Sequence, residues 1–179
     1  STTGTKRVKF INCHVEGTDQ SGTGWEIDDG VSDVFLLNCT VINAQRGIDM
    51  HTHSNTGKPP AYNVVIGNMK IYSAYDDAIR ITGDSGTGEQ GHDIYLENIL
   101  VDTCGGRGIY ISYMDNVVIS NAFIDSPAGY GIYSVNTTHK TRIENTRVTN
   151  GDLLGIYLEA GGTVINSQVD NCKEGIKGV

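Results

Sequence analysis

The sequence repeats one pattern seven times, and few folds are built from repeats of this kind. The pattern is apolar, any, apolar, any, Asn, any, any, Val or Ile, with copies 21 to 30 residues apart. A second pattern, a small residue followed by apolar, any, apolar, comes after each copy at steps of 20 to 31 residues. Two patterns that share one irregular period indicate seven similar units in series. The repeated asparagines are Asn12, Asn38, Asn68, Asn98, Asn121, Asn145 and Asn166.

Each unit predicts short strands rather than helices. Its apolar residues alternate with other residues, and most units are too short to add a helix of about ten residues. Identical strand positions that recur once per unit pair in parallel with their copies above and below. We therefore expect an all-β solenoid, a single-stranded parallel β-helix of about seven coils. The repeated Asn fits an inward-facing ladder at a bend, which would make Asn38 of the glycosylation pattern Asn38-Cys39-Thr40 inaccessible.

The length of the chain indicates how many domains it forms, and its charge excludes one class of partner. The 179 residues fit one domain, residues 1–179. The 13 basic and 21 acidic residues give a net charge of −8, without the basic run that a nucleic-acid partner requires. No apolar run reaches the roughly 18 residues of a membrane span. Because the sequence begins within a coil and stops partway through another, we expect a piece of a longer helix whose caps lie elsewhere.

The four cysteines do not predict a metal site. None has C-x-x-C spacing, so zinc binding has no support. Cys13 and Cys39 share a position in adjacent units, where reduced thiols are favoured over a disulfide. Cys104 and Cys172 share another position three units apart, which is beyond the reach of a disulfide.

The Asn-ladder coils resemble the pectin lyase type of right-handed β-helix. This fold occurs in polysaccharide lyases, polygalacturonases, mannuronan C5-epimerases and phage tailspikes. The resemblance covers essentially the whole chain and implies a polysaccharide partner and a place outside the cell or on a virion surface. A spike would in addition be a homotrimer in its full-length form. Insertions at 54–62 and 83–91 would place loops beside the same face.

Alternation along the second-pattern strand predicts columns of outward side chains, with neighbouring coils roughly 4.8 Å apart. The tyrosines of the first column would stack on sugars or, alternatively, decorate a solvated sheet. That column runs Glu26, Asp49, Arg80, Tyr110, Tyr133, Tyr157 and Lys177. The next runs Asp28, His51, Thr82, Ser112, Val135 and Glu159. Arg46, Asp76, Asp77, Arg107 and Tyr130 precede the strand.

Two local motifs resemble catalytic motifs of these families. The stretch 46–51 resembles the Y-G-F-D-P-H motif of mannuronan C5-epimerases. The Asp and the His of that motif correspond to Asp49 and His51, while Arg46 replaces its tyrosine. The arginine of those enzymes falls one position from Arg107. Asp76-Asp77 resembles the paired acids of polygalacturonases, although the Gly-His motif of that family is missing in register.

The chemistry required of these residues follows from the reactions. Epimerisation or β-elimination of a uronate needs a cation and a base, and we expect Arg80 or Arg107 as the cation and His51 as the base, with His53 beside it. Hydrolysis needs two carboxyl groups, and the candidate pairs are Glu26 with Asp49, or Asp49 with Asp77. Asp28, Arg46, Asp76 and the tyrosines would bind substrate.

The sequence predicts a carbohydrate-active β-helix that binds and depolymerises an extended polysaccharide, as a hydrolase or a lyase. One alternative is a uronate C5-epimerase. Another is a non-catalytic shaft or receptor-binding segment of a viral spike or adhesin. No cofactor is expected, and a Ca²⁺ ion near Asp76 is left open.

Overall fold

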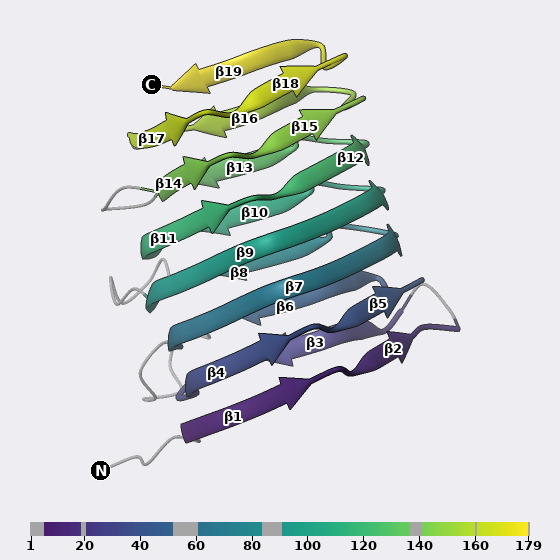
Figure 1. Ribbon diagram of the computed structural model, residues 1–179, viewed down its shortest axis with the longest axis vertical. Helices are drawn as coiled ribbons and strands as arrows, with labels where there is room; N and C mark the ends of the chain where they lie inside the picture. Colours follow the sequence, from purple (N-terminus) through teal and green to yellow (C-terminus); the bar gives the residue numbers. More distant parts are fainter. Residues whose placement is uncertain are drawn as a thin grey trace.

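The computed structural model describes residues 6–18, 21–51, 61–83, 91–136, 141–159 and 161–178. These residues form 19 strands and no helix, and every strand pairing among them is parallel. Over the same ranges, no helix has the length and hydropathy to cross a membrane. Figure 1 shows the strands stacked rung over rung from the N-terminus to the C-terminus. The predicted parallel β-helix is confirmed.

Three straight segments make up a coil. The first two belong to a twelve-stranded sheet and the third to a seven-stranded sheet, which lies behind the other in Figure 1. The first segments are β1 (Lys6–Ile11), β4 (Ser32–Leu37), β11 (Met114–Ser120), β14 (Thr141–Glu144) and β17 (Gly162–Ile165). The second segments are β2 (His14–Glu16), β5 (Thr40–Ile42), β12 (Phe123–Pro127), β15 (Arg147–Thr149) and β18 (Gln168–Asp170). In β7 (Tyr62–Ala74) and β9 (Gly91–Cys104) the two segments form one continuous strand.

The seven-stranded sheet carries most of the predicted site residues. Its strands lie in the order β19-β16-β13-β10-β8-β6-β3. Their bounds are β3 (Thr23–Ile27), β6 (Arg46–His51), β8 (Ile79–Thr82), β10 (Ile109–Ser112), β13 (Ile132–Val135), β16 (Leu154–Leu158) and β19 (Glu174–Gly178).

Columns of aliphatic side chains fill the interior. Ile48, Ile79 and Ile109 lie over one another in the seven-stranded sheet, and each is fully buried. Leu36, Ile66 and Leu96 do the same in the twelve-stranded sheet. Burial of each such side chain contributes about 1.5–3 kcal/mol. The apolar positions of both sequence patterns therefore form the core, and the residues between them face outward.

The repeated asparagines form a stacked ladder at the bend between the first two segments. Asn68 donates from Nδ2 to Asn38 Oδ1 over 2.9 Å, and Asn98 donates in the same way to Asn68 over 3.1 Å. All seven have a positive φ, between 47° and 56°, a conformation that asparagine tolerates better than most residues. The side chains are exposed, so the prediction of an inward ladder was wrong. The left-handed residue interrupts the alternation and turns its side chain to solvent, which makes Asn38 accessible.

A close approach at the corner before the third segment explains the small residue that opens the second pattern. A Cβ atom at Gly131 would lie 2.3 Å from Val148 Cγ1 and 2.5 Å from the carbonyl oxygen of Gly155. Gly24, Gly47, Gly108 and Gly155 are equally crowded, whereas nothing lies within 4 Å of such an atom at Gly175.

We expect Gly131→Ala to lower the free energy of unfolding by about 1–3 kcal/mol, because the added methyl group overpacks the corner. Gly175→Ala is the matched control, since it makes the same change at the equivalent position of the last coil, where the space is open. Urea unfolding measures both. Equal midpoints for the two variants would contradict the packing explanation.

All four cysteines are free thiols. Burial raises the pKa of the Cys104 thiol to about 12, so this side chain behaves as a small apolar group of the core. Cys39 is also buried, and this burial raises its pKa.

Candidate functional site

The outward side chains of the seven-stranded sheet form the predicted column. Asp49 lies beside Glu26 on one side and Arg80 on the other, and Arg80 lies beside Tyr110. Tyr110, Tyr133, Tyr157 and Lys177 continue the register to the last coil. The sheet therefore brings charged residues from distant parts of the sequence onto its first coils and places a tyrosine row beyond them.

Asp49 is the centre of the charged cluster. Its side chain is only 6% exposed, and its two oxygens accept bonds from Arg80 Nε at 2.7 Å and Arg80 Nη2 at 2.9 Å. Arg46 Nη1 donates to the same carboxylate over 3.2 Å, and Arg46 Nη2 donates to Asp76 over 2.6 Å. With N–H donors on both oxygens, Asp49 is placed to hold two guanidinium groups and not to donate a proton.

His51 lies among three carboxylates. Its Nδ1 is 3.7 Å from Asp49 Oδ1, and its Nε2 is 3.6 Å from Glu26 Oε1 and 4.0 Å from Asp28 Oδ1. The side chain of His51 is 15% exposed, whereas those of Glu26 and Asp28 are 62% and 52% exposed. Glu26 and Asp28 are thus the carboxyl groups of this cluster that a substrate can reach.

The two acids of the Asp76-Asp77 motif turn to different partners. Asp76 pairs with Arg46, while Asp77 is buried and accepts bonds from Arg107 Nε, Arg107 Nη2 and the Arg107 backbone N–H, at 2.7 to 2.8 Å. Burial lowers the pKa of Arg107, but the bonds that Arg107 donates to Asp77 and the charge of that carboxylate outweigh burial, so the net pKa is raised. The motif is therefore divided between two ion pairs.

The tyrosine row is stacked on itself. The Tyr110 and Tyr133 ring centroids are 5.7 Å apart with planes at 16°, and Tyr130 stacks on Tyr133 at 4.5 Å and 18°. Tyr157 lies 5.3 Å from Tyr133, and Arg107 Cζ lies 3.5 Å from the centroid of the Tyr110 ring. The faces of these rings are covered by one another. Sugars therefore cannot stack on them in the way that the sequence predicts. Ring edges and hydroxyl groups remain for a ligand.

Only part of the second predicted column is exposed to solvent. His51, Thr82, Ser112 and Val135 lie in register, but Ser112 and Val135 are buried, with 2% and 4% of their surface exposed. The residues that follow them, Tyr113 and Asn136, have positive φ values. The chain turns there, so the alternation ends and the last side chains of β10 and β13 are enclosed.

The remaining site predictions concern His53 and a Ca²⁺ ion. His53 lies at 52–60, outside the described residues. Within the ranges that are described, no group of three or more His, Cys, Asp or Glu side chains could hold a metal ion. The acids near Asp76 therefore give no support to a Ca²⁺ site.

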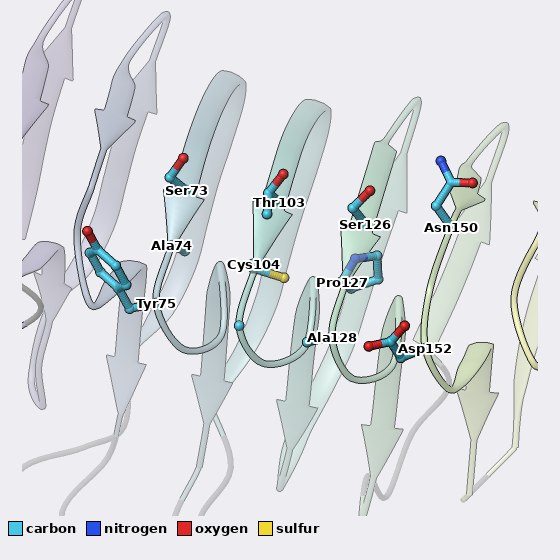
Figure 2. Close-up of a pocket in the computed structure, with 11 residues that line it drawn as sticks. Ser73, Ala74, Tyr75, Thr103, Cys104, Ser126, Pro127, Ala128, Asn150 and Asp152 are labelled. Atoms are coloured by element: carbon cyan, nitrogen blue, oxygen red, sulfur yellow. The ribbon is translucent and has the colours of Figure 1, made fainter.

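A groove that the sequence did not predict follows the corner between the second and third segments. It has a volume of about 580 Å³ and crosses four coils. Figure 2 shows Ser73, Thr103, Ser126 and Asn150 in a row along it. These four residues share a left-handed conformation and recur with the period of the other patterns. That recurrence of small polar residues at the ends of these second segments was the signal available in the sequence.

Asp125, beside this groove, gives a pH-dependent contribution to stability. Thr149 Oγ1 donates to Asp125 over 2.7 Å and Asn150 Nδ2 over 2.8 Å, and these bonds lower the pKa of Asp125 below its ordinary 3.8. A folded-state pKa below the unfolded one stabilises the fold above pH 3.8, and this stabilisation is lost as the pH falls through the folded value.

We expect Thr149→Val to reduce the acid dependence of the unfolding free energy, because it removes the first of these donors. Urea unfolding between about pH 5 and pH 2 measures the change. Thr163→Val, at an exposed position, serves as the control. An unchanged slope in Thr149→Val would show that Asp125 is not stabilised by this bond.

The comparisons with known proteins agree with the fold. Residues 59–178 match the family model described as a right handed beta helix region. The match covers more than half of the chain, which therefore belongs to the right-handed β-helix family. The predicted handedness and the resemblance to this superfamily are confirmed. No curated protein matches the chain.

A solved structure of a catalytic domain of GH87 α-1,3-glucanase in complex with nigerose is similar at 17% sequence identity, with a TM-score of 0.49. The match covers 96% of this chain and 42% of that one, so the chain spans less than half of the length of that protein.

Proposed function

We propose that this chain binds an extended polysaccharide along the exposed face of its seven-stranded sheet and hydrolyses it at Glu26. The observation that carries the proposal is the cluster around His51. Glu26 and Asp28, two exposed carboxyl groups, both lie within 4.0 Å of His51 Nε2. The same face continues past Arg80 to the hydroxyl groups of the tyrosine row, which lie in line with this cluster.

We assign Glu26 and Asp28 as an inverting pair. Glu26 lies near the end of β3 and Asp28 directly follows the strand, so a sugar that reaches one carboxyl group also reaches the other. Inverting glycosidases hold their carboxyl groups roughly 6.5–9.5 Å apart to admit a water molecule. Glu26 would protonate the leaving oxygen, Asp28 would activate the water, and His51 would position both carboxyl groups. In this proposal Asp49 is a positioning residue for Arg46 and Arg80.

The acid pairs that the sequence predicts are less suited to proton transfer, since Asp49 and Asp77 are both bound by guanidinium groups. A lyase would use Arg80 as the cation and His51 as the base, with the same substrate face. C5 epimerisation has the least support, because Arg46 replaces the tyrosine and is bound to Asp49 and Asp76.

A panel of neutral glucans, alginate, pectate and bacterial capsular polysaccharides tests the proposal. Hydrolysis produces new reducing ends without absorbance near 235 nm, and proton NMR of the first products gives the inverted anomer. Absorbance near 235 nm would identify a lyase, and exchange at H5 without cleavage an epimerase. Either result would overturn the assignment of Glu26 as the proton donor in hydrolysis.

One observation favours a non-catalytic role as the second candidate. Asp49 and Asp77 pair with arginines, and the tyrosines stack on one another, as they would in a shaft or receptor-binding segment of a viral spike or adhesin. Binding without any reaction on the panel would favour this role. An extracellular or virion-surface location and a homotrimeric full-length protein belong to the same proposal, and gel filtration with light scattering tests the trimer.

A further inference from the structure

We propose that the corner groove is a second carbohydrate site, which binds a short segment of a neutral linear glycan along the axis of the β-helix. The groove has a volume of about 580 Å³, within the range of small-molecule sites. It lies where the second segments end, and not on the open face of the seven-stranded sheet. Its walls come from Ser73, Tyr75, Thr103, Ser126, Pro127 and Asn150.

The floor of the groove is preformed. Backbone N–H groups of Tyr75, Gly105, Ala128 and Asp152 each donate to a carbonyl one coil below, over 2.9 to 3.1 Å. Gly105 allows this close approach, because a Cβ atom there would lie 2.3 Å from the carbonyl oxygen of Tyr75. A site held by such a ladder loses little conformational entropy when a ligand binds.

The polar row matches a polymer with one hydroxyl-bearing unit per coil. Ser73, Thr103 and Ser126 offer hydroxyl groups on successive coils (Figure 2). Coils in a parallel stack repeat roughly every 4.8 Å, a distance comparable to the advance of one sugar unit in an extended glycan. Hydroxyl groups both donate and accept. Thr103 Oγ1 already donates to Asp102 over 3.3 Å, so this rung would accept a bond from a sugar hydroxyl.

Tyr75 supplies an aromatic surface that the tyrosine row lacks. Tyr75 lines the groove with its ring at the N-terminal end of the row (Figure 2), and the residue is 44% exposed. Among the residues that the structure describes, no second ring or cation packs against the Tyr75 ring, in contrast to Tyr110 and Tyr133. A sugar ring can therefore stack on it.

The charge of the surroundings selects a neutral glycan. Asp152 lines the groove and Asp125 adjoins it, while the chain as a whole carries a net charge of −8. Polyuronates and phosphorylated ligands would be repelled. A peptide is also a poor fit, since the backbone groups of the floor are already paired and offer no open strand edge.

Isothermal titration with cellohexaose, laminarihexaose and maltohexaose tests the proposal, with a hexamer of galacturonate as the charged comparison. We expect at least one neutral hexamer to bind and the galacturonate not to bind. Ser126→Arg would block the middle of the groove and weaken binding about tenfold or more, and Tyr75→Ala would weaken it as well. Ser120→Arg is the matched control, because Ser120 lies on the same coil in a column with Glu97 and Glu144, away from the groove.

The outcomes separate this site from the one on the sheet. Three results would overturn the proposal. Ser126→Arg and Ser120→Arg could bind the hexamer equally well, both could lose binding equally, or the wild-type chain could bind no neutral hexamer. Glu26→Gln should leave hexamer binding at the corner unchanged. If the wild-type chain cleaves none of the polysaccharides but Ser126→Arg alone loses hexamer binding, the proposed hydrolysis fails and the corner site stands.

Discussion

Glu26→Gln is expected to lower kcat/KM for polysaccharide cleavage by about 10²–10⁴-fold, the usual contribution of a general acid. Glutamine keeps the shape of the side chain but cannot supply a proton to the leaving oxygen. Glu26 is 62% exposed, so the substitution should leave the unfolding midpoint unchanged. The rate of release of reducing ends, measured on the polysaccharide that the wild-type chain cleaves, gives the result.

Glu16→Gln is the matched control for this prediction. Glu16 lies on the same coil as Glu26, with a side chain 64% exposed, but in β2 of the other sheet. Its substitution should leave cleavage unchanged. Wild-type rates in Glu26→Gln would show that another group donates the proton, and the proposed division of roles between Glu26 and Asp28 would be wrong.

Asp77→Ala is expected to lower the free energy of unfolding by about 3 kcal/mol, at the lower end of the range for breaking a buried ion pair. Asp77 has 1% of its surface exposed and holds Arg107 through three bonds. Without Asp77, the partly buried Arg107 side chain and backbone N–H lose their acceptor. The lower end applies because the Arg107 side chain is 29% exposed and water can reach it. Urea unfolding with an unchanged m-value would measure the loss.

The adjacent acid provides the control. Asp76 is 39% exposed at its side chain and, among the residues that the structure describes, pairs only with Arg46, so Asp76→Ala should cost less than about 1 kcal/mol. Similar losses in the two variants would contradict the contrast between a buried and a surface pair.

The fold and the register of the candidate site could be predicted because stacking in a solenoid follows directly from the repeat. Once Asn12 to Asn166 define the coils, Glu26, Asp49 and Arg80 must be neighbours, and the structure has them so. The exposure of the asparagines could not be predicted in this way, because periodicity does not reveal which residue adopts a left-handed conformation.

Side-chain partners were the other part that the repeat did not determine. Spacing places Arg46 near Asp49, but only the rotamers show that Arg46 joins Asp49 to Asp76 and that Asp77 turns to Arg107. The tyrosine row was predicted as a column, yet the mutual stacking of its rings depends on side-chain torsions. The corner groove was missed because small residues and a backbone turn create it, without a charged or aromatic motif to mark each coil.

The one-to-one register between coils restricts how the length of this protein can vary. Within the described ranges, each strand pairs only with the copies of itself on the neighbouring coils, so a shift by one residue would turn a whole strand inside out. Deletion or duplication of an entire rung avoids that shift and changes the length of every column by one position. Whole-rung duplication is thus the route by which such a protein can extend its reach along a polymer without redesigning its interior.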